Sequence, residues 1–133
     1  MPDRAAPLVL YVEDDRIHLL LMEEVFRLLP GWELRCAETG QEALAALAER
    51  QPDLVLVDMN LPDMTGLELA LRVRADAALS ATLAGTRWVA LSADDPSDVV
   101  RATRAAGFDA YWLKPIDVPQ LQGSLRKLLG RGA

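Results

Sequence analysis

Residues 53–66 of the chain read Asp-Leu-Val-Leu-Val-Asp-Met-Asn-Leu-Pro-Asp-Met-Thr-Gly. Within them, Leu54 to Val57 form a short apolar run, the pattern of a central strand buried on both faces of a parallel sheet. Asp58 follows at once, and Pro62 and Gly66 then predict a loop. In open α/β sheets, ligands sit just beyond the carboxyl ends of the strands. Asp58 is therefore the first candidate for chemistry, against the alternative of a solvated acid that merely ends a strand.

The rest of the chain alternates short apolar runs with amphipathic helical patterns. The predicted strands cover residues 8–12, 32–37, 54–57, 88–91 and 110–113, and helices are predicted to begin after Asp15, Thr39, Thr65, Asp95 and Asp117. Thr39 with Glu42, and Thr65 with Glu68, have the spacing of a capping box. Residues 76–87 are ambiguous, because their alanines favour a longer third helix whereas Gly85 favours a loop.

Five strands alternating with five helices predict a doubly wound α/β domain with a five-stranded parallel sheet, whose crossovers cover both faces. We expect the flavodoxin-like (βα)5 arrangement with strand order 2-1-3-4-5, because this order brings the ends of strands 1 and 3 together at its switch point. The domain is expected to span residues 8–130, with loose termini at 1–7 and 131–133.

The length, charge and cysteine content of the chain limit the classes of protein to which it can belong. A chain of 133 residues can bury a hydrophobic core without disulfides or structural metals. Because 51% of its residues are hydrophobic and only 5% are aromatic, the core is predicted to be aliphatic. Fourteen basic and 20 acidic residues give a net charge of −6, which argues against direct nucleic-acid binding. No apolar run reaches the ~20 residues of a membrane span, and no secretory signal is evident. With a single cysteine, no intrachain disulfide can form, and we expect a cytoplasmic protein without membrane contact.

On the predicted topology, polar side chains from four strand ends meet at one edge of the sheet. These are Glu13 and Asp14 after the first strand, Asp58 after the third, Ser92 after the fourth and Lys114 after the fifth. Crowded carboxylates raise one another's pKa, and a bound cation relieves that repulsion. Oxygen ligands without nearby His or Cys indicate Mg²⁺ or Mn²⁺. Helix capping is the alternative reading of the first acidic pair, but Asp15 is placed to fill that role.

Lys114 lies between a predicted buried strand and Pro115, so its side chain is held near this edge. Most lysines are simply solvated. Opposite a metal-bound carboxylate, however, a lysine supplies a point charge to an incoming phosphoryl oxygen.

These motifs resemble the receiver domain of two-component response regulators, along nearly the whole chain from Leu8 to Leu129. The segments that carry the resemblance are Val-Glu13-Asp14-Asp, Leu-Val-Asp58-Met-Asn-Leu-Pro, Ser92-Ala93 and Lys114-Pro115. Glu13 stands where many members have Asp, and Ser92 where many have Thr. The segments around Ser92 and Lys114 look most like receivers that are joined to, or work beside, hybrid sensor kinases.

The resemblance implies a signalling role for Asp58. It would accept a phosphoryl group from a phosphohistidine of a sensor histidine kinase or histidine phosphotransfer protein, and later lose it by self-catalysed hydrolysis. It further implies that Asp14 and Asp58 ligate Mg²⁺, that Glu13 supports the ion through water, and that Asn60 contributes its backbone carbonyl.

The resemblance also assigns the remaining positions. Lys114 would hold a phosphoryl oxygen, Ser92 would be the hydroxyl switch and Tyr111 the aromatic switch, and the Lys114–Pro115 peptide bond would be cis. A downstream protein partner would then read the surface formed by the fourth helix, the fifth strand and the fifth helix.

Three alternative functions each require a residue pattern that can be compared with this sequence. A metal-dependent aspartyl phosphatase would carry a second aspartate two residues after its nucleophile, where this chain has Asn60. A flavodoxin-like binding module would need a Ser/Thr/Gly-rich loop after the first strand, where this chain has Glu13, Asp14 and Asp15. A pseudo-receiver that only binds partners would lack some of the chemical positions, all of which are present. His18, in the first helix, is expected to lie on the surface rather than to act as a phosphorelay histidine.

Overall fold

The computed structural model describes residues 7–29, 31–92, 97–114 and 116–128. Its strands are β1 Leu8–Val12, β2 Glu33–Ala37, β3 Leu54–Asp58, β4 Arg87–Ser92 and β5 Ala110–Leu113. Its helices are α1 Arg16–Arg27, α2 Gly40–Glu49, α3 Gly66–Ala75, α4 Ala77–Thr82, α5 Ser97–Ala105 and α6 Val118–Leu128. The predicted cap at Asp95, the residue Ala93 and the predicted cis bond before Pro115 lie outside the described residues.

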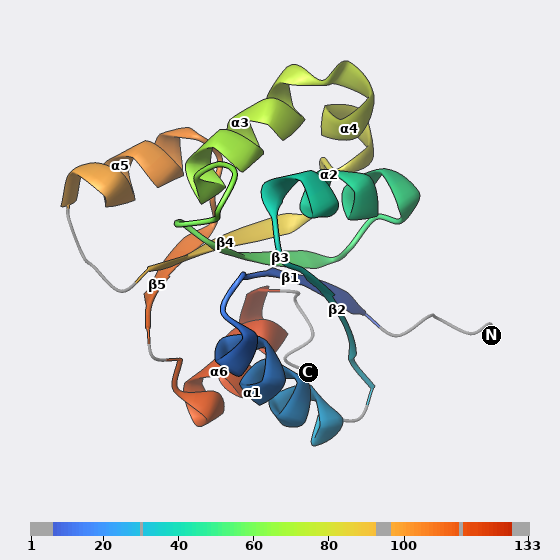
Figure 1. The fold of residues 1–133 in the computed structure, drawn as a ribbon, viewed down its shortest axis with the longest axis vertical. Coiled ribbons are helices and arrows are strands. Elements are labelled where there is room, and N and C mark those ends of the chain that lie inside the picture. Colours follow the sequence, from blue (N-terminus) through green and yellow to red (C-terminus); the bar gives the residue numbers. More distant parts are fainter. Residues whose placement is uncertain (1–6, 30, 93–96, 115, 129–133) are drawn as a thin grey trace.

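The strands form one parallel sheet in the order β2-β1-β3-β4-β5, which confirms the predicted topology. Helices α1 and α6 cover one face of the sheet, and α2, α3, α4 and α5 cover the other (Figure 1). Strands β1 and β3 lie side by side near the middle, so that their carboxyl ends are adjacent. This placement brings the two acidic strand ends of the sequence together.

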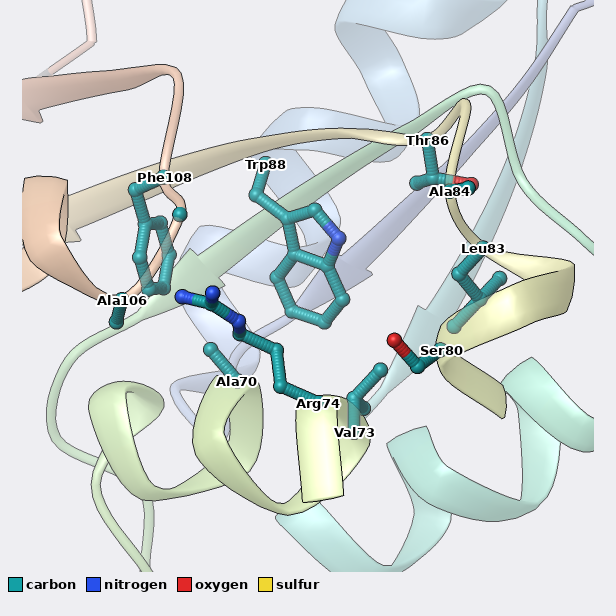
Figure 2. A pocket seen from close by; sticks show the side chains of 11 residues that line it. Ala70, Val73, Arg74, Ser80, Leu83, Ala84, Thr86, Trp88, Ala106 and Phe108 are labelled. Atoms are coloured by element: carbon teal, nitrogen blue, oxygen red, sulfur yellow. The ribbon is translucent and has the colours of Figure 1, made fainter. Parts of the chain in front are cut away.

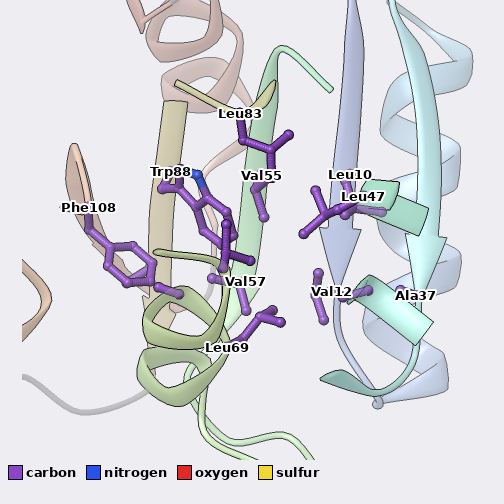
Figure 3. Close-up of a cluster of buried hydrophobic side chains, with 14 of the residues drawn as sticks. Leu10, Val12, Ala37, Leu47, Val55, Val57, Leu69, Leu83, Trp88 and Phe108 are labelled. Carbon is purple, nitrogen blue, oxygen red and sulfur yellow. The ribbon is translucent and has the colours of Figure 1, made fainter. Parts of the chain in front are cut away.

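Each face of the sheet carries its own hydrophobic core, because successive side chains of a strand point to opposite faces. Leu10 and Val12 of β1 join the core under α2 and α3, shown in Figure 3, together with Trp88 and Phe108. Val9 and Tyr11 join the second core, under α1 and α6. Burial on both faces explains why the central strands are apolar throughout rather than alternating.

The ambiguous segment after α3 contains a short additional helix. The Asp76 carboxylate accepts hydrogen bonds from the backbone N–H groups of Ala78 and Leu79, at 3.0 and 3.1 Å, and so begins α4. The described residues therefore contain six helices, and the prediction of five was wrong. The cap at Asp76 separates two helices where alanine content alone favoured one.

The two predicted capping boxes have different outcomes. At α3, the Thr65 hydroxyl accepts from Glu68 N–H at 3.0 Å and the Glu68 carboxylate accepts from Thr65 N–H at 2.8 Å, so the box is complete. At α2, Thr39 accepts from Glu42 N–H, but the Glu42 carboxylate bonds Glu38 N–H instead of Thr39 N–H. The capping box at α2 is therefore only half formed.

Among the helices of the described residues, none combines the length and the apolar composition needed to cross a membrane.

Candidate functional site

Glu13 and Asp58 lie next to each other at the carboxyl edge of the sheet because β1 and β3 are paired in register up to Val12 and Val57. Glu13 N–H donates to Ala37 O at 2.9 Å, which keeps the chain in line with the sheet just beyond β1. Asp58 is the last residue of β3. Both carboxylates are buried, with 1% of Glu13 and 7% of Asp58 exposed. Two acids in such a place need a counter-charge.

Lys114 supplies that counter-charge from the other end of the chain. Its backbone N–H donates to Ser92 O at 2.8 Å, which fixes the residue directly after β5. Its Nζ donates to Glu13 Oε1 at 2.6 Å and to Asp58 Oδ2 at 2.8 Å. A single ammonium group therefore bridges the two buried carboxylates. The structure thus places Lys114 at the predicted edge, whereas its contact with a phosphoryl oxygen stays a prediction.

The loop after β3 fixes the second oxygen of Asp58. Asn60 N–H donates to Asp58 Oδ1 at 2.9 Å, and Gly66 N–H donates to Met59 O at 3.0 Å. A Cβ on residue 66 would lie 2.8 Å from the backbone oxygen of Asp58, which is too close for any side chain. Glycine at this position lets α3 begin directly against the acidic strand end.

The electrostatics of the pair are asymmetric. Burial by itself would raise the pKa of Asp58, but hydrogen bonding with Glu13, Asn60 N–H and Lys114 outweighs burial and lowers it. Burial and the neighbouring Asp58 raise the pKa of Glu13, although Lys114 opposes them. Burial would lower the pKa of Lys114, and the two carboxylates raise it instead. Asp58 is thus the group held as a carboxylate, opposite a lysine held as a cation.

Asp14 completes a group of acids that fits a divalent cation. One carboxylate oxygen from each of Glu13, Asp14 and Asp58 lies within 4.8 Å of the other two, and Asp14 is exposed to solvent. An all-oxygen donor set with one side open to water suits a hard ion such as Mg²⁺, which keeps several of its water ligands. The residues present therefore fit the predicted metal. Asn60, also exposed, lies at the rim of this group.

Ser92 and Tyr111 lie beside this cluster, on neighbouring strands. Ser92 ends β4, is 6% exposed and is paired with Leu113 in the register of β4 and β5. Tyr111 is paired with Ala90, and its half-buried ring packs against the core under α3. Because side chains alternate along a strand, Ser92 belongs to the same face of the sheet as Ala90. The two predicted switch positions therefore share one face.

His18 and Tyr11 also contact the cluster, although the sequence did not predict either contact. His18 Nδ1 lies 3.3 Å from Lys114 Nζ and 3.4 Å from Glu13 Oε1, while 43% of its side chain remains exposed, as a surface position requires. The Tyr11 hydroxyl donates to Glu13 Oε1 at 3.1 Å. Burial, with a further contribution from Glu13, holds the pKa of Tyr11 above its usual range, so that it remains a donor. Tyr11 lies two residues before Glu13, which directly follows β1, and this spacing was the available signal.

A mostly apolar groove of about 420 Å³ runs from the cluster along α1. Its inner end is lined by Tyr11, His18 and Lys114, and its outer walls come from Leu21, Met22, Glu24, Val25, Leu28, Ile116, Val118 and Leu121. Leu21 is 59% exposed and Leu28 is 76% exposed. The groove therefore joins an exposed apolar helix face to the charged site.

A second cavity, of about 180 Å³, lies between α3, α4 and the beginning of β4 (Figure 2). The rings of Trp88 and Phe108 meet edge to face there, with centroids 5.9 Å apart. The Arg74 guanidinium lines the cavity and donates to Ala105 O at 3.1 Å. None of the predicted site residues lines it, so it is separate from the carboxylate cluster.

Comparison with known proteins gives one consistent result. The family model of the response regulator receiver domain matches residues 9–126. The chain is 35% identical to the virulence sensor protein BvgS of Bordetella pertussis, over 94% of this chain and 10% of BvgS. It is 32% identical to the probable transcriptional regulatory protein TcrX of Mycobacterium tuberculosis, over 94% of this chain and 51% of TcrX. The polar-differentiation response regulator DivK of Brucella ovis is also 32% identical, over 92% of this chain and 95% of DivK.

The solved structures agree with these relatives. The chemotaxis protein CheY4 of Vibrio cholerae superposes with a TM-score of 0.84 at 26% identity, covering 94% of this chain and all (100%) of CheY4. The receiver domain of the sensor histidine kinase PA1611 of Pseudomonas aeruginosa gives a TM-score of 0.79 at 25% identity, covering 95% and 99%. That structure has a magnesium ion coordinated in its active-site cleft. The chain spans only about a tenth of BvgS and half of TcrX.

Proposed function

This chain belongs to the response regulator receiver family, and we propose that it accepts a phosphoryl group on Asp58 from a phosphohistidine. The observation that carries the proposal is the environment of the Asp58 carboxylate. Its Oδ2 is 2.8 Å from Lys114 Nζ and its Oδ1 is 2.9 Å from Asn60 N. The nucleophile is thus buried, ionised and held in place beside a cation.

In the proposed reaction, a carboxylate oxygen of Asp58 attacks the phosphorus atom. The O–P bond forms as the P–N bond breaks, and the imidazole leaves with its electron pair and is then reprotonated by solvent. Lys114 offsets negative charge on a phosphoryl oxygen, and its contact with Asp58 Oδ2 keeps the ammonium within reach of the place where that charge develops. Attack of water on the same phosphorus atom regenerates the Asp58 carboxylate, which is the self-dephosphorylation we propose.

Glu13, Asp14, Asp58 and the backbone carbonyl of Asn60 would hold Mg²⁺, or Mn²⁺ in its place. The proximity of the three carboxylates and the magnesium-bearing receiver of PA1611 support this assignment. When bound, the ion would neutralise further charge on the phosphoryl oxygens. Because few protein ligands and several waters would coordinate it, its affinity is expected to be low.

The groove along α1 is the proposed docking place of the phosphodonor, a helix of a sensor histidine kinase or histidine phosphotransfer protein. Leu21 and Leu28, which line this groove, are 59% and 76% exposed, which is unusual for large apolar side chains. Ile17 and Leu20, also on α1 but outside the groove, are 68% and 53% exposed. The inner end of the groove is formed by His18 and Lys114. A helix seated on these residues would bring its phosphohistidine to Asp58.

The proposed output is a change in the surface formed by α5, β5 and α6, which a downstream protein partner would read. Ser92 and Tyr111 support this proposal because they lie on one face of the sheet beside the cluster. A phosphoryl group on Asp58 offers oxygen acceptors to the Ser92 hydroxyl, and Tyr111 is the bulky neighbour that would then move. The size of this shift depends on how differently the phosphoryl group contacts the two states.

The test of the proposed function is phosphorylation with a small donor. Incubation with phosphoramidate and Mg²⁺ should add one phosphoryl group to the wild-type protein and none to Asp58→Asn, as measured by intact mass. Asp76→Asn is the matched control, since Asp76 caps α4 and asparagine is also a good cap. Modification of Asp58→Asn to the wild-type extent, or of Asp76→Asn to a lesser one, would contradict the assignment.

A further inference from the structure

The hydroxyl of Tyr11 is a buried polar group that contacts the site but has no role in the proposed reaction. Only 2% of Tyr11 is exposed, and its ring lies in the core under α1 and α6. Its hydroxyl donates to Glu13 Oε1 at 3.1 Å. We propose that Tyr11 is a positioning residue, which holds the Glu13 carboxylate in the orientation that cation binding requires. The inference rests on the proposed function, because it assigns Glu13 to the metal site.

The other side chains that contact Glu13 are less firmly fixed. Lys114 Nζ donates to Oε1 at 2.6 Å, His18 Nδ1 lies 3.4 Å from it, and Asp15 N–H donates to Oε2 at 3.3 Å. The Lys114 and His18 side chains are 15% and 43% exposed. Lys114 must also turn towards a phosphoryl oxygen in the proposed reaction. The Tyr11 hydroxyl is therefore the contact of Oε1 that stays in place when the lysine moves.

A glutamate at this position has a particular need for such a contact. Its side chain has one more rotatable bond than an aspartate, and fixing it costs more conformational entropy. Glu13 directly follows β1, and its N–H still bonds Ala37 O of β2, so the i, i+2 spacing directs Tyr11 and Glu13 to the same face of the sheet. The rigid phenol can therefore reach the carboxylate. Fixing Oε1 limits where Oε2 can lie. Loss of the hydroxyl should therefore spread the carboxylate over several orientations.

The experiment is a double-mutant cycle of Tyr11→Phe and Glu13→Ala, read by Mg²⁺ titration of the unphosphorylated protein. Tyr11→Phe keeps the ring and should weaken Mg²⁺ binding on the order of 10-fold, as expected when an outer-shell partner is lost. In the Glu13→Ala background, the same change should leave the dissociation constant unaltered. Val9→Ala is the matched control, because it loosens the same face of β1 without touching Glu13, and its Mg²⁺ affinity should equal that of the wild type.

Urea midpoints of the same proteins without metal give an independent readout. Tyr11→Phe should lower the urea midpoint in the wild-type background. In the Glu13→Ala background the buried hydroxyl has lost its acceptor, so Tyr11→Phe should leave the urea midpoint unchanged or raise it. An unchanged Mg²⁺ affinity of Tyr11→Phe, or an equal loss in both backgrounds, would overturn the proposal. If the wild type bound no Mg²⁺, the proposed function would fail, and additive urea midpoints would then separately overturn the role of Tyr11.

Discussion

The two edges of the sheet use carboxylates in opposite ways. At the edge where the strands begin, Asp53 Oδ2 accepts from Leu8 N–H and Asp109 Oδ2 accepts from Trp88 N–H, both at 2.8 Å. Each of these carboxylates accepts a hydrogen bond from a backbone N–H of a neighbouring strand. At the edge where the strands end, Glu13 and Asp58 face each other and depend on one lysine. The first edge stabilises the fold, whereas the second keeps reactive charge close together.

Removal of one cation from each edge should separate these roles most clearly. Lys114→Met should slow phosphorylation by phosphoramidate about 10²–10³-fold, the range found when one preorganised donor to a developing negative charge is lost. Arg87, whose Nη1 lies 3.6 Å from Asp109 Oδ1, is the matched residue at the other edge. Arg87→Met should leave the rate unchanged, with circular dichroism confirming that both variants fold. Equal rates for the two variants would mean that the edges do not differ in this way.

Glycines next to the two edges offer a second comparison. Gly66→Ala places a Cβ 2.8 Å from the Asp58 backbone oxygen, so the loop must shift, and we expect a loss of about 1–3 kcal/mol in the free energy of unfolding. Gly85, just before β4, has no atom within 4 Å of an added Cβ and does not have a positive φ. Gly85→Ala should therefore gain about 0.4–1 kcal/mol. Urea denaturation measures both, and a Gly66→Ala variant as stable as the wild type would refute the close approach.

The smallest effect is expected from alanine in place of one acid at each edge. Asp53→Ala leaves the N–H of the buried Leu8 without its acceptor and should cost about 1 kcal/mol in the free energy of unfolding. Asp58→Ala removes a buried acid from beside Glu13 and leaves Lys114 paired with Glu13. Asn60 N–H loses its acceptor, but Asn60 is an exposed residue, so water can replace the carboxylate. The stability of Asp58→Ala should equal or exceed that of the wild type. A stability loss for Asp58→Ala as large as that for Asp53→Ala would contradict the distinction.

The sequence was sufficient to place Glu13, Asp58, Ser92 and Lys114 at one edge, because parallel strands deliver their last residues to the same side. It was not sufficient for His18, whose contact with Lys114 depends on how α1 is rotated against the sheet. That rotation is set by the packing of the buried Leu19, Met22 and Phe26 of α1 against the sheet. The apolar spacing indicates which face of α1 is buried, but it does not place one side chain against a residue from the far end of the chain.

Two other differences have local causes. Glu42 could bond either of two adjacent N–H groups, and only the folded rotamer selects that of Glu38. The additional helix α4 arises because Asp76 both follows α3 and caps the next turn. In each case the sequence allows two local hydrogen-bonding arrangements, and the spacing of the residues alone does not select between them.

The bridge from Lys114 to Glu13 has a consequence for biosynthesis. The two residues are 101 positions apart, and Lys114 is 56 positions after Asp58. A nascent chain therefore carries both acids of the cluster long before the ribosome adds their counter-ion. Until β5 has emerged and paired with β4, Lys114 cannot reach the two acids of this edge. If Asp58 accepts a phosphoryl group as proposed, acceptance would therefore be confined to chains in which β5 is already in place.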